Sequence, residues 1–373
     1  MYKIMEITAA VVLEKGGDFI LQKMQLETPR ADEVLIKIVG TGTCHTDMAA
    51  RDNILGVPNF PVILGHEGSG IVEEVGSSVT KVKKGDHVVL TFGHCGKCIN
   101  CESGEPAYCE HFMGLNFTGS RLDGSHSHHG DSVDFNDNFF SQSSFATYSL
   151  ANENNVVKVP KDAPLEILGP LGCGIQTGAG AIINSLGVSA GKSLIIAGAG
   201  AVGLAALLAA KVCSATTIVA IDINSDRLEF AKELGATHII NSRESDIAQE
   251  LLKILPGGFD FGFDTTGRNE VINSILSGLR SHGSCGIVGV AKLPLELEMN
   301  SFVARGLQIK GIVEGDSVPD DFIPALVRLY QNGQFPFDKL IKTYSFEDIN
   351  RAIEDSEKGI TIKPVIKIGE YGR

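Results

Sequence analysis

Residues 194–203 read Leu-Ile-Ile-Ala-Gly-Ala-Gly-Ala-Val-Gly, an apolar run that passes directly into three spaced glycines. The run predicts a buried strand, and the apolar residues that continue to Ala210 predict a helix. In a G-x-G-x-x-G pattern between strand and helix, Gly198 makes the tight turn and Gly200 admits a close backbone approach, while Gly203 lets the helix pack on the strand. The pattern therefore predicts a strand–turn–helix unit that binds the pyrophosphate of a dinucleotide.

The flanking residues indicate which dinucleotide. Ala201 and Val202 open the predicted helix, whose N-terminus attracts phosphate groups. Asp222 ends the next apolar strand, nineteen residues past Gly203. A carboxylate there accepts hydrogen bonds from a ribose 2′-hydroxyl and repels a 2′-phosphate, although a strand that merely ends in a solvated acid is the alternative. NAD is therefore favoured over NADP, and the nearby Arg227 weighs against that preference.

Strand and helix patterns alternate through the middle of the chain. They predict strands at 194–197, 217–221, 259–264 and 286–290, and helices at 227–234 and 247–254. This alternation is typical of a doubly wound parallel sheet, a Rossmann domain, which we place at 175–313. Short strands precede it, at 34–39 and 70–75 among others, and helices at 322–331 and 346–357 with a strand at 363–368 follow it.

Composition limits the classes of partner. Acids outnumber bases 45 to 32, for a net charge of −13 and a pI near 5.2. Such a charge repels nucleic acids and anionic membranes, so we expect neither as a partner. Residues 193–210 carry no charge, but their glycines break a membrane span, and no secretory signal is recognised at the N-terminus. Eight cysteines are too few for a disulfide scaffold, and a cytoplasmic protein is expected.

Four of the cysteines crowd into one loop, as Cys95-x2-Cys98-x2-Cys101-x7-Cys109. An iron–sulfur cluster is the main competitor to a zinc site, because the first three cysteines match the ferredoxin run. That run continues with three residues to a cysteine and then proline, whereas here the gap is seven and Glu110 follows. Four thiolates around a structural zinc ion fit better.

A second metal site is predicted from dispersed residues. Cys44 begins the run Cys-His-Thr-Asp, His66 lies in Gly-His-Glu, and Cys173 stands between two glycines. Each alone is more often a core or turn residue. Together, two thiolates and an imidazole make a zinc site that keeps a fourth position open for chemistry. Asp47 is then the expected partner for the other nitrogen of the His66 ring.

These residues resemble the zinc-dependent medium-chain alcohol dehydrogenases over essentially the whole chain. The family pattern G-H-E-x2-G-x5-G-x2-V is met at Gly65, His66, Glu67, Gly70, Gly76 and Val79. The resemblance implies a mostly-β, GroES-like catalytic domain at 1–174 and 314–373, beside the Rossmann domain. It also implies that Cys44, His66 and Cys173 hold the catalytic zinc, that Glu67 belongs to the same site, and that Lys363 lies near the cofactor pyrophosphate.

Within the family, the run Cys-His-Thr-Asp-Met-Ala-Ala-Arg-Asp before the Gly-His-Glu block looks most like bacterial aryl-alcohol dehydrogenases. The resemblance implies that Thr46 accepts the proton of the alcohol. Liver-type enzymes end their proton relay at a histidine where this chain has Ala49, so the relay ends at His45 or at water. Glutathione-dependent formaldehyde dehydrogenases carry a substrate-binding arginine where this chain has Met113.

The expected reaction is reversible hydride transfer between a primary, benzyl-type alcohol and NAD, with two zinc ions per chain. Dehydrogenases of terpenoid or other aliphatic alcohols are the nearest alternative, and a glutathione-dependent formaldehyde dehydrogenase is a weaker one. A homo-oligomer, dimer or tetramer, is expected. The polar segment 113–142 predicts a surface lobe, and no role is assigned to the histidine-rich segment 111–129, which overlaps it.

Overall fold

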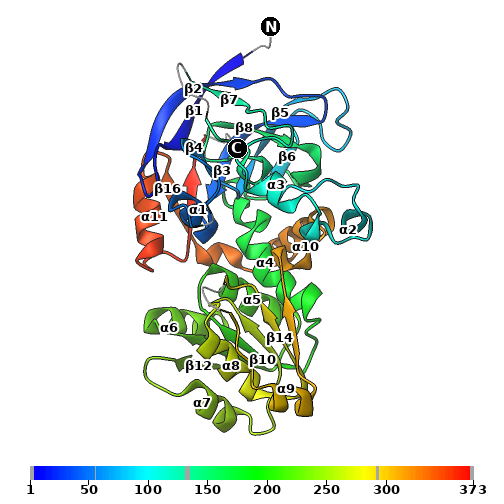
Figure 1. Ribbon diagram of the computed structural model, residues 1–373, viewed down its shortest axis with the longest axis vertical. Coiled ribbons are helices and arrows are strands. Elements are labelled where there is room, and N and C mark those ends of the chain that lie inside the picture. Colours follow the sequence, from blue (N-terminus) through cyan, green and yellow to red (C-terminus); the bar gives the residue numbers. More distant parts are fainter. Residues whose placement is uncertain (1–3, 55, 131–134, 291–293, 370–373) are drawn as a thin grey trace. The chain divides into compact units, whose positions relative to one another are not determined.

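The computed structural model describes residues 4–54, 56–130, 135–290 and 294–369 (Figure 1). The chain forms two compact units. The first unit comprises Met1–Cys173, Val318–Asn332 and Asp338–Arg373. The second unit comprises Gly174–Ser317 and Gly333–Phe337.

The second unit is built on a six-stranded parallel sheet in the order β12-β11-β10-β13-β14-β15. Its strands are β10 (Ser193–Ala197), β11 (Thr217–Asp222), β12 (His238–Asn241), β13 (Phe259–Asp264), β14 (Leu279–Ile287) and β15 (Gln308–Gly311). Its helices are α4 (Gly174–Gly180), α5 (Ala201–Val212), α6 (Ser225–Leu234), α7 (Ile247–Ile254), α8 (Asn269–Gly278) and α9 (Met299–Arg305). The doubly wound fold predicted from the alternating pattern is therefore confirmed.

The glycine turn lies between β10 and α5. β10 is fully buried, as a near-continuous apolar strand in a parallel sheet should be. A Cβ added at Gly203 would overlap the carbonyl oxygen of Gly198, so only glycine lets α5 pack this close to the turn. The uncharged stretch 193–210 is thus a strand, a turn and a helix. Within the described ranges, none of the helices has both the length and the apolar character to cross a membrane.

One strand prediction is wrong in its bounds. The apolar run 286–290 predicts a strand, but β14 begins at Leu279 and ends at Ile287. Its pairing with β13 resumes at Ser284 after an irregularity, and the strand includes the polar residues 280–282. Val290, which hydrophobicity placed in the sheet, is 85% exposed.

The first unit contains two sheets. One has the order β4-β1-β2-β7, and the other has the order β16-β17-β3-β5-β6-β9 with β8 paired to β3. The strands are β1 (Ile4–Val12), β2 (Phe19–Glu27), β3 (Glu33–Gly42), β4 (Val62–Ile63), β5 (Gly68–Val75), β6 (His87–Leu90), β7 (His128–His129), β8 (Tyr148–Asn152), β9 (Val156–Val159), β16 (Ile341–Ser345) and β17 (Lys363–Lys367). The helices are α1 (His45–Arg51), α2 (Ile99–Glu102), α3 (Phe112–Asn116), α10 (Pro319–Gln331) and α11 (Ile349–Glu357).

The side chains of β3 alternate between two hydrophobic cores of this unit. Leu35 packs into one apolar cluster with Ile7 and Leu26, while Ile36 packs into another with Val88. Successive side chains of a strand point to opposite faces, so one strand supports two cores. The mostly-β, GroES-like architecture implied by the family resemblance is confirmed.

The polar segment 113–142 is not simply a surface lobe. Asn116, Ser127, His128 and Asp137 are buried, although residues 131–134 lie outside the described part of the chain. Asp137 accepts hydrogen bonds from the backbone N–H of Ser127 at 2.6 Å and of His128 at 2.8 Å, and from the Ser127 hydroxyl at 2.7 Å. Its carboxylate also lies 2.9 Å from Nδ1 of His128. The histidine-rich stretch thus has a structural role, because it satisfies a buried charge.

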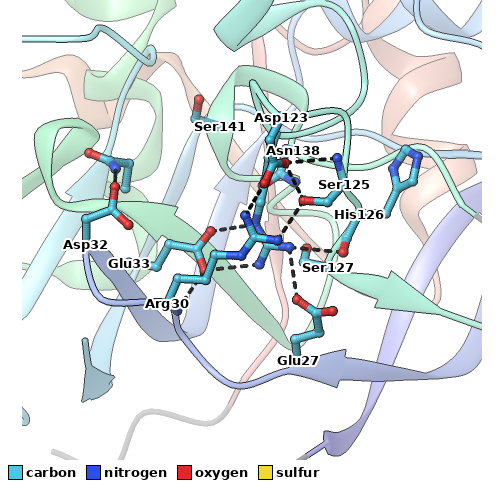
Figure 2. A network of polar contacts seen from close by, with 12 residues as sticks. Glu27, Arg30, Asp32, Glu33, Asp123, Ser125, His126, Ser127, Asn138 and Ser141 are labelled. Atoms are coloured by element: carbon cyan, nitrogen blue, oxygen red, sulfur yellow. Dashed lines mark hydrogen bonds and ion pairs between the residues drawn. The ribbon is translucent and has the colours of Figure 1, made fainter. Parts of the chain in front are cut away.

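A second polar network fixes the same segment to the strands. Arg121 donates to both oxygens of Glu33, at 2.6 and 3.0 Å, and to Glu27 at 2.9 Å. Arg30 donates to Asp123 at 2.8 Å and to Ser125 at 2.7 Å, as Figure 2 shows. Composition alone suggested a solvated lobe, because hydrogen-bonded burial of polar side chains leaves no periodic signal.

The charge of Asp137 should stabilise the fold in a pH-dependent way. Burial acts to raise the pKa of Asp137, but hydrogen bonds from His126, His128 and Ser127 hold it well below the usual range. Asp137→Asn should therefore lower the free energy of unfolding at pH 7 by more than about 2 kcal/mol, measured by urea denaturation. The contribution is complete above the unfolded pKa of about 3.9 and is lost as the pH falls through the folded value, so the difference should shrink at acid pH.

The matched control is Asp123→Asn, which changes an exposed carboxylate of the same segment and should leave the unfolding transition nearly unchanged. A loss that is equal at pH 7 and at pH 3.5 would show that Asp137 acts through shape rather than through charge.

Candidate active site

Three of the predicted metal ligands meet in the first unit. Cys44 directly precedes α1, His66 lies between β4 and β5, and Cys173 follows a short helical turn. Their ligand atoms and one carboxylate oxygen of Glu67 all lie within 4.8 Å of one another. His66, Glu67 and Cys173 are buried and Cys44 is partly buried, so the cluster is shielded from bulk water.

Asp47 orients the imidazole. It lies in the first turn of α1 with no exposed surface, and its Oδ1 is 2.9 Å from Nδ1 of His66. The same carboxylate accepts the backbone N–H of Gly65 at 3.0 Å and of Cys44 at 2.9 Å. A carboxylate on one ring nitrogen fixes the tautomer that leaves the other nitrogen free to bind a metal.

The residues present fit a zinc ion. Nε2 of His66 is buried and has no hydrogen-bond partner in the described part of the chain. Buried polar atoms are almost always paired, so an unpaired imidazole nitrogen beside two thiols indicates a site for a metal. Two thiols and an imidazole form a donor set that zinc accepts.

The electrostatics of Cys44 favour a metal ligand, whereas Asp47 favours the protonated form of His66, whose proton a bound metal would displace. A hydrogen bond from Cys173 lowers the pKa of Cys44 well below its usual range, and the charge of Lys363 adds to this against the effect of burial. Burial lowers the pKa of His66, but the charge and hydrogen bond of Asp47 outweigh it and raise the pKa. The thiolate that a metal requires is therefore stabilised at Cys44.

Lys363 lies with this cluster. Its Nζ is 2.9 Å from both carboxylate oxygens of Glu67 and 3.1 Å from the carbonyl oxygen of Thr43, and the side chain is 3% exposed. Burial acts to lower the pKa of Lys363, whereas Glu67 and Cys44 raise it. Burial raises the pKa of Glu67, with Lys363 opposing it. The contact of Lys363 with a cofactor pyrophosphate, implied by the family resemblance, stays a prediction.

The four cysteines of the loop also come together. Their sulfur atoms lie within 4.8 Å of one another, with Cys98 3.5 Å from Cys101 and 4.0 Å from Cys109, and Cys95 4.0 Å from Cys101. A tetrahedral zinc with bonds near 2.3 Å would hold its sulfurs about 3.8 Å apart, so the spacing suits one ion. Backbone N–H groups of Glu110 and Cys101 lower the pKa of Cys98 to about 6.

The rival interpretations of this loop fit less well. All eight cysteines have free thiols, and sulfurs 3.5 Å apart are not joined by a disulfide. A four-iron cluster would place each thiolate on a different iron, and therefore further apart. The geometry favours a single ion with four thiolate ligands.

Aromatic rings surround His66. The ring of Phe140 lies 4.5 Å from the His66 ring between centroids, and that of Phe139 lies 5.6 Å from it. Phe117, which is only partly buried, packs against Phe140 at 5.1 Å. An apolar aromatic surface therefore adjoins the candidate metal ligand. No motif in the sequence marked these three phenylalanines.

The loop that presents Phe140 has an unusual backbone. Asn138, Phe140, Ser141 and Ser143 all have positive φ, at 56°, 53°, 54° and 49°. Such strain persists only where surrounding contacts determine it, and it gathers at functional sites. The buried Gln142 supplies contacts of this kind and was also missed, because a polar residue in a polar stretch carries no pattern.

Gln142 ties the loop to the ligand strands. Its amide nitrogen donates to the carbonyl oxygens of His66 at 3.0 Å and Thr91 at 3.1 Å, and its oxygen accepts the N–H of Gly68 at 3.1 Å. The aromatic surface and the metal ligand are therefore held by one side chain.

Three of the predicted nucleotide residues, Gly198, Asp222 and Arg227, line a cavity of about 500 Å³ in the second unit. It is lined by Ala197, Gly198, Ile221, Asp222, Ile223, Arg227, Ser242, Arg243, Ile247, Thr266, Arg268, Glu270 and Val271. Asp222 accepts N–H groups of Ala199 at 2.6 Å, Ile223 at 2.8 Å and Asn224 at 2.9 Å, which fix its carboxylate at the end of β11.

The other cofactor residues predicted in the second unit follow Gly198, which lines the cavity, closely in sequence. Gly200 is the residue before α5, and Ala201, Val202 and Gly203 form its first turn. Arg227 lies in α6 and lines the same cavity as Asp222. The structure thus brings together, within one unit, an acid and a base with opposite preferences for a 2′-phosphate.

The predicted proton-transfer residues lie at the start of α1. The Thr46 hydroxyl is 3.8 Å from Sγ of Cys44 and is partly buried. His45 is exposed at the first position of the helix, and Ala49 follows one turn later. The Thr46 hydroxyl therefore lies beside the candidate ligand Cys44, and the roles of Thr46 and His45 in proton transfer stay predictions.

Comparisons with known proteins agree with this geometry. The family model for the alcohol dehydrogenase GroES-like domain matches residues 30–161, and that for zinc-binding dehydrogenases matches residues 201–332. Geraniol dehydrogenase of Castellaniella defragrans is 44% identical over 362 residues, which cover 96% of each chain.

Two solved structures are similar over the whole chain. Benzyl alcohol dehydrogenase of Acinetobacter calcoaceticus has a TM-score of 0.95 and 52% identity, covering 98% of this chain and 100% of that one. An alcohol dehydrogenase zinc-binding domain protein of Burkholderia ambifaria has a TM-score of 0.96 and 50% identity, covering 99% and 100%. Together with the matched domains, these relatives show that the chain belongs to the zinc-dependent medium-chain alcohol dehydrogenases.

Proposed function

We propose that this alcohol dehydrogenase transfers hydride reversibly between a primary, benzyl-type alcohol and NAD, forming the aldehyde and NADH. The observation that carries the proposal is the buried Nε2 of His66, which lacks a hydrogen-bond partner in the described residues and faces two thiols. Cys44, His66 and Cys173 would hold the catalytic zinc, and the four cysteines of the loop would hold a second, structural zinc.

The aromatic rings beside His66 support an aromatic substrate. The ring of Phe140 is buried beside His66, and the partly buried Phe117 packs against it; aromatic pairs contribute about 0.5–1.5 kcal/mol beyond the area they bury. The 52% identity to a benzyl alcohol dehydrogenase points the same way. The 44% identity to a geraniol dehydrogenase supports terpenoid alcohols as the second candidate.

The bound groups would carry the redox chemistry. Zinc supplies a Lewis acid that lowers the pKa of the alcohol hydroxyl, and NAD supplies the hydride acceptor. The chain's own residues position these groups. Asp47 holds the His66 ring, Asp222 would accept from the ribose of a bound cofactor, and the first turn of α5 would face its phosphates.

Proton removal is assigned to Thr46. Its hydroxyl lies next to Cys44 and can accept the proton of the alcohol while passing its own proton outward. His45 or water would complete the path. A homo-oligomeric state stays a prediction, which sedimentation of the purified enzyme would check.

The substrate proposal is tested by steady-state NADH formation with matched alcohols. Benzyl alcohol and cyclohexylmethanol have the same size, and only one is aromatic. We expect kcat/KM to favour benzyl alcohol by about 2–13-fold, the range that an aromatic contact of 0.5–1.5 kcal/mol gives. A higher kcat/KM for geraniol would establish the second candidate, and no NADH from any alcohol would reject both.

The two zinc ions should respond differently to loss of a ligand. Cys98→Ser should release one zinc and destabilise the fold, because a structural zinc contributes to folding directly. Cys44→Ser should abolish activity and leave the unfolding transition largely intact. Metal analysis and thermal unfolding measure both effects. Iron with sulfide, or one zinc per chain in fully active enzyme, would contradict the assignment.

Cofactor choice should depend on Asp222. Asp222→Ala should lower kcat/KM with NAD by about 10–100-fold, which corresponds to about 1–3 kcal/mol of lost buried hydrogen bonding. The preference for NAD over NADP, measured as the ratio of the two kcat/KM values, should therefore decrease. Arg227→Ala is the control, because it removes the neighbouring cation. Wild-type enzyme that uses NADP as well as NAD would show that Asp222 does not decide.

Thr46 should be needed for the proton step. Thr46→Ala should lower kcat by about 10²-fold or more, the usual scale for positioned proton transfer, whereas Thr46→Ser keeps the hydroxyl and should be far milder. Single-turnover hydride transfer measures the step directly. If His45 ends the path, His45→Gln should slow oxidation chiefly at low pH. Near-normal single turnover in Thr46→Ala would remove Thr46 from the mechanism.

A further inference from the structure

We propose that Asn116 is a positioning residue that gives the enzyme its preference for aromatic alcohols. It does so by fixing the rings of Phe117 and Phe140 relative to the candidate metal ligand His66. This role rests on the proposed function and deepens it, since it names the side chain that holds the aromatic surface in place. All the residues concerned belong to the first unit.

Asn116 is the last residue of α3 and has no exposed surface. Its side-chain oxygen accepts the backbone N–H of Gly93 at 2.7 Å, and its amide nitrogen donates to the carbonyl oxygen of Gly93 at 2.9 Å. The same nitrogen donates to the carbonyl oxygen of Phe112 at 2.7 Å, one turn earlier in the helix. Both backbone groups of a buried glycine are thus paired with one side chain, so the end of α3 is fixed to the segment that follows β6.

Ser141 joins the same helix to the aromatic loop. Its hydroxyl donates to the carbonyl oxygen of Leu115 in α3 at 2.8 Å. A Cβ added at Gly93 would overlap Oγ of Ser141, so α3, the loop and the segment after β6 meet at one close contact. Ser141 has a φ of 54° and directly follows Phe140, so its hydrogen bond holds a strained part of the loop.

The two rings are neighbours of these two polar residues in sequence. Phe117 directly follows Asn116, and Phe140 directly precedes Ser141. The ring centroids of Phe117 and Phe140 are 5.1 Å apart with their planes at 66°, and the Phe140 ring lies 4.5 Å from that of His66. The energy of aromatic contacts depends on the relative position of the rings. A shift of α3 against the loop therefore changes the aromatic surface beside the candidate ligand.

The segment after β6 also contacts the loops that carry the candidate ligands. The Thr91 hydroxyl donates at 2.7 Å to the carbonyl oxygen of Gly172, which directly precedes Cys173. The carbonyl oxygen of Thr91 accepts the side-chain N–H of Gln142 at 3.1 Å, and the same amide nitrogen donates to the carbonyl oxygen of His66 at 3.0 Å. The end of α3 is therefore positioned against a segment that is itself fixed beside two candidate ligands.

A purely structural role of this side chain is the alternative, because loss of a buried hydrogen-bonding partner lowers stability wherever it lies. The two roles have different consequences for selectivity. A fold that is only less stable contains less active enzyme, which lowers the apparent kcat/KM of all alcohols by the same factor and leaves their ratio unchanged. A displaced ring surface changes the ratio itself.

The test is the ratio of kcat/KM for benzyl alcohol to kcat/KM for cyclohexylmethanol, measured by NADH formation with the full-length, zinc-loaded enzyme. Wild type should favour benzyl alcohol by about 2–13-fold, and Asn116→Ala should bring the ratio to about 1. The loss should appear as a higher KM for benzyl alcohol with kcat nearly unchanged, because the rings bind the substrate and do not act on the reacting atoms. Ser141→Ala removes only one hydrogen bond and should lower the ratio in the same direction, which keeps the test decisive if Asn116→Ala does not fold.

Thr118→Ala is the matched control. The Thr118 hydroxyl also donates to a carbonyl oxygen of α3, that of Gly114 at 2.7 Å, but the residue is exposed, so the ratio should stay at the wild-type value. A wild-type ratio in active Asn116→Ala or in Ser141→Ala, or an equal decrease in Thr118→Ala, would overturn the role of Asn116 and leave the proposed function intact. Wild type without a preference for benzyl alcohol would overturn both.

Discussion

The buried carboxylate of Asp47 is the interaction on which the site depends. Its two oxygens join the start of α1, the turn before β5 and the imidazole of His66. Two segments separated in sequence, the start of α1 and the Gly65–His66 turn, are thus held by one charge, and the orientation of the His66 ring follows from it. The cost of burying that charge is offset only when all these donors are in place, so the site forms as a unit or not at all.

The first unit repeats this principle elsewhere. Asp137 forms hydrogen bonds with the histidine-rich segment. Arg121 forms ion pairs with Glu27 and Glu33, and Lys363 forms an ion pair with Glu67. Buried charges of this kind add little net stability, because desolvation opposes the attraction, but a wrong arrangement leaves a charge unpaired and is costly. Buried charge pairs therefore favour one geometry of the loops over others. Apolar packing does not select the geometry of irregular segments in this way.

Motifs with strict spacing made much of the molecule predictable. The glycine turn required its strand and helix, and the cysteine spacings and the Gly-His-Glu block marked residues that the structure brings together. What could not be predicted depends on contacts between distant segments. The rings of Phe139 and Phe140 beside His66, the bridging Gln142 and the pairing of Lys363 with Glu67 leave no periodicity. The bounds of β14 were misjudged for a related reason, since pairing outweighed hydrophobicity.

The nucleotide cavity is lined by second-unit residues alone, while the metal cluster and its aromatic surface come from the first unit alone. A substitution in the lining of this cavity therefore changes no residue of the candidate metal cluster, and the converse also holds. The two sets of residues share no side chain. Mutation can therefore alter the residues of one candidate site while leaving the residues of the other site unchanged.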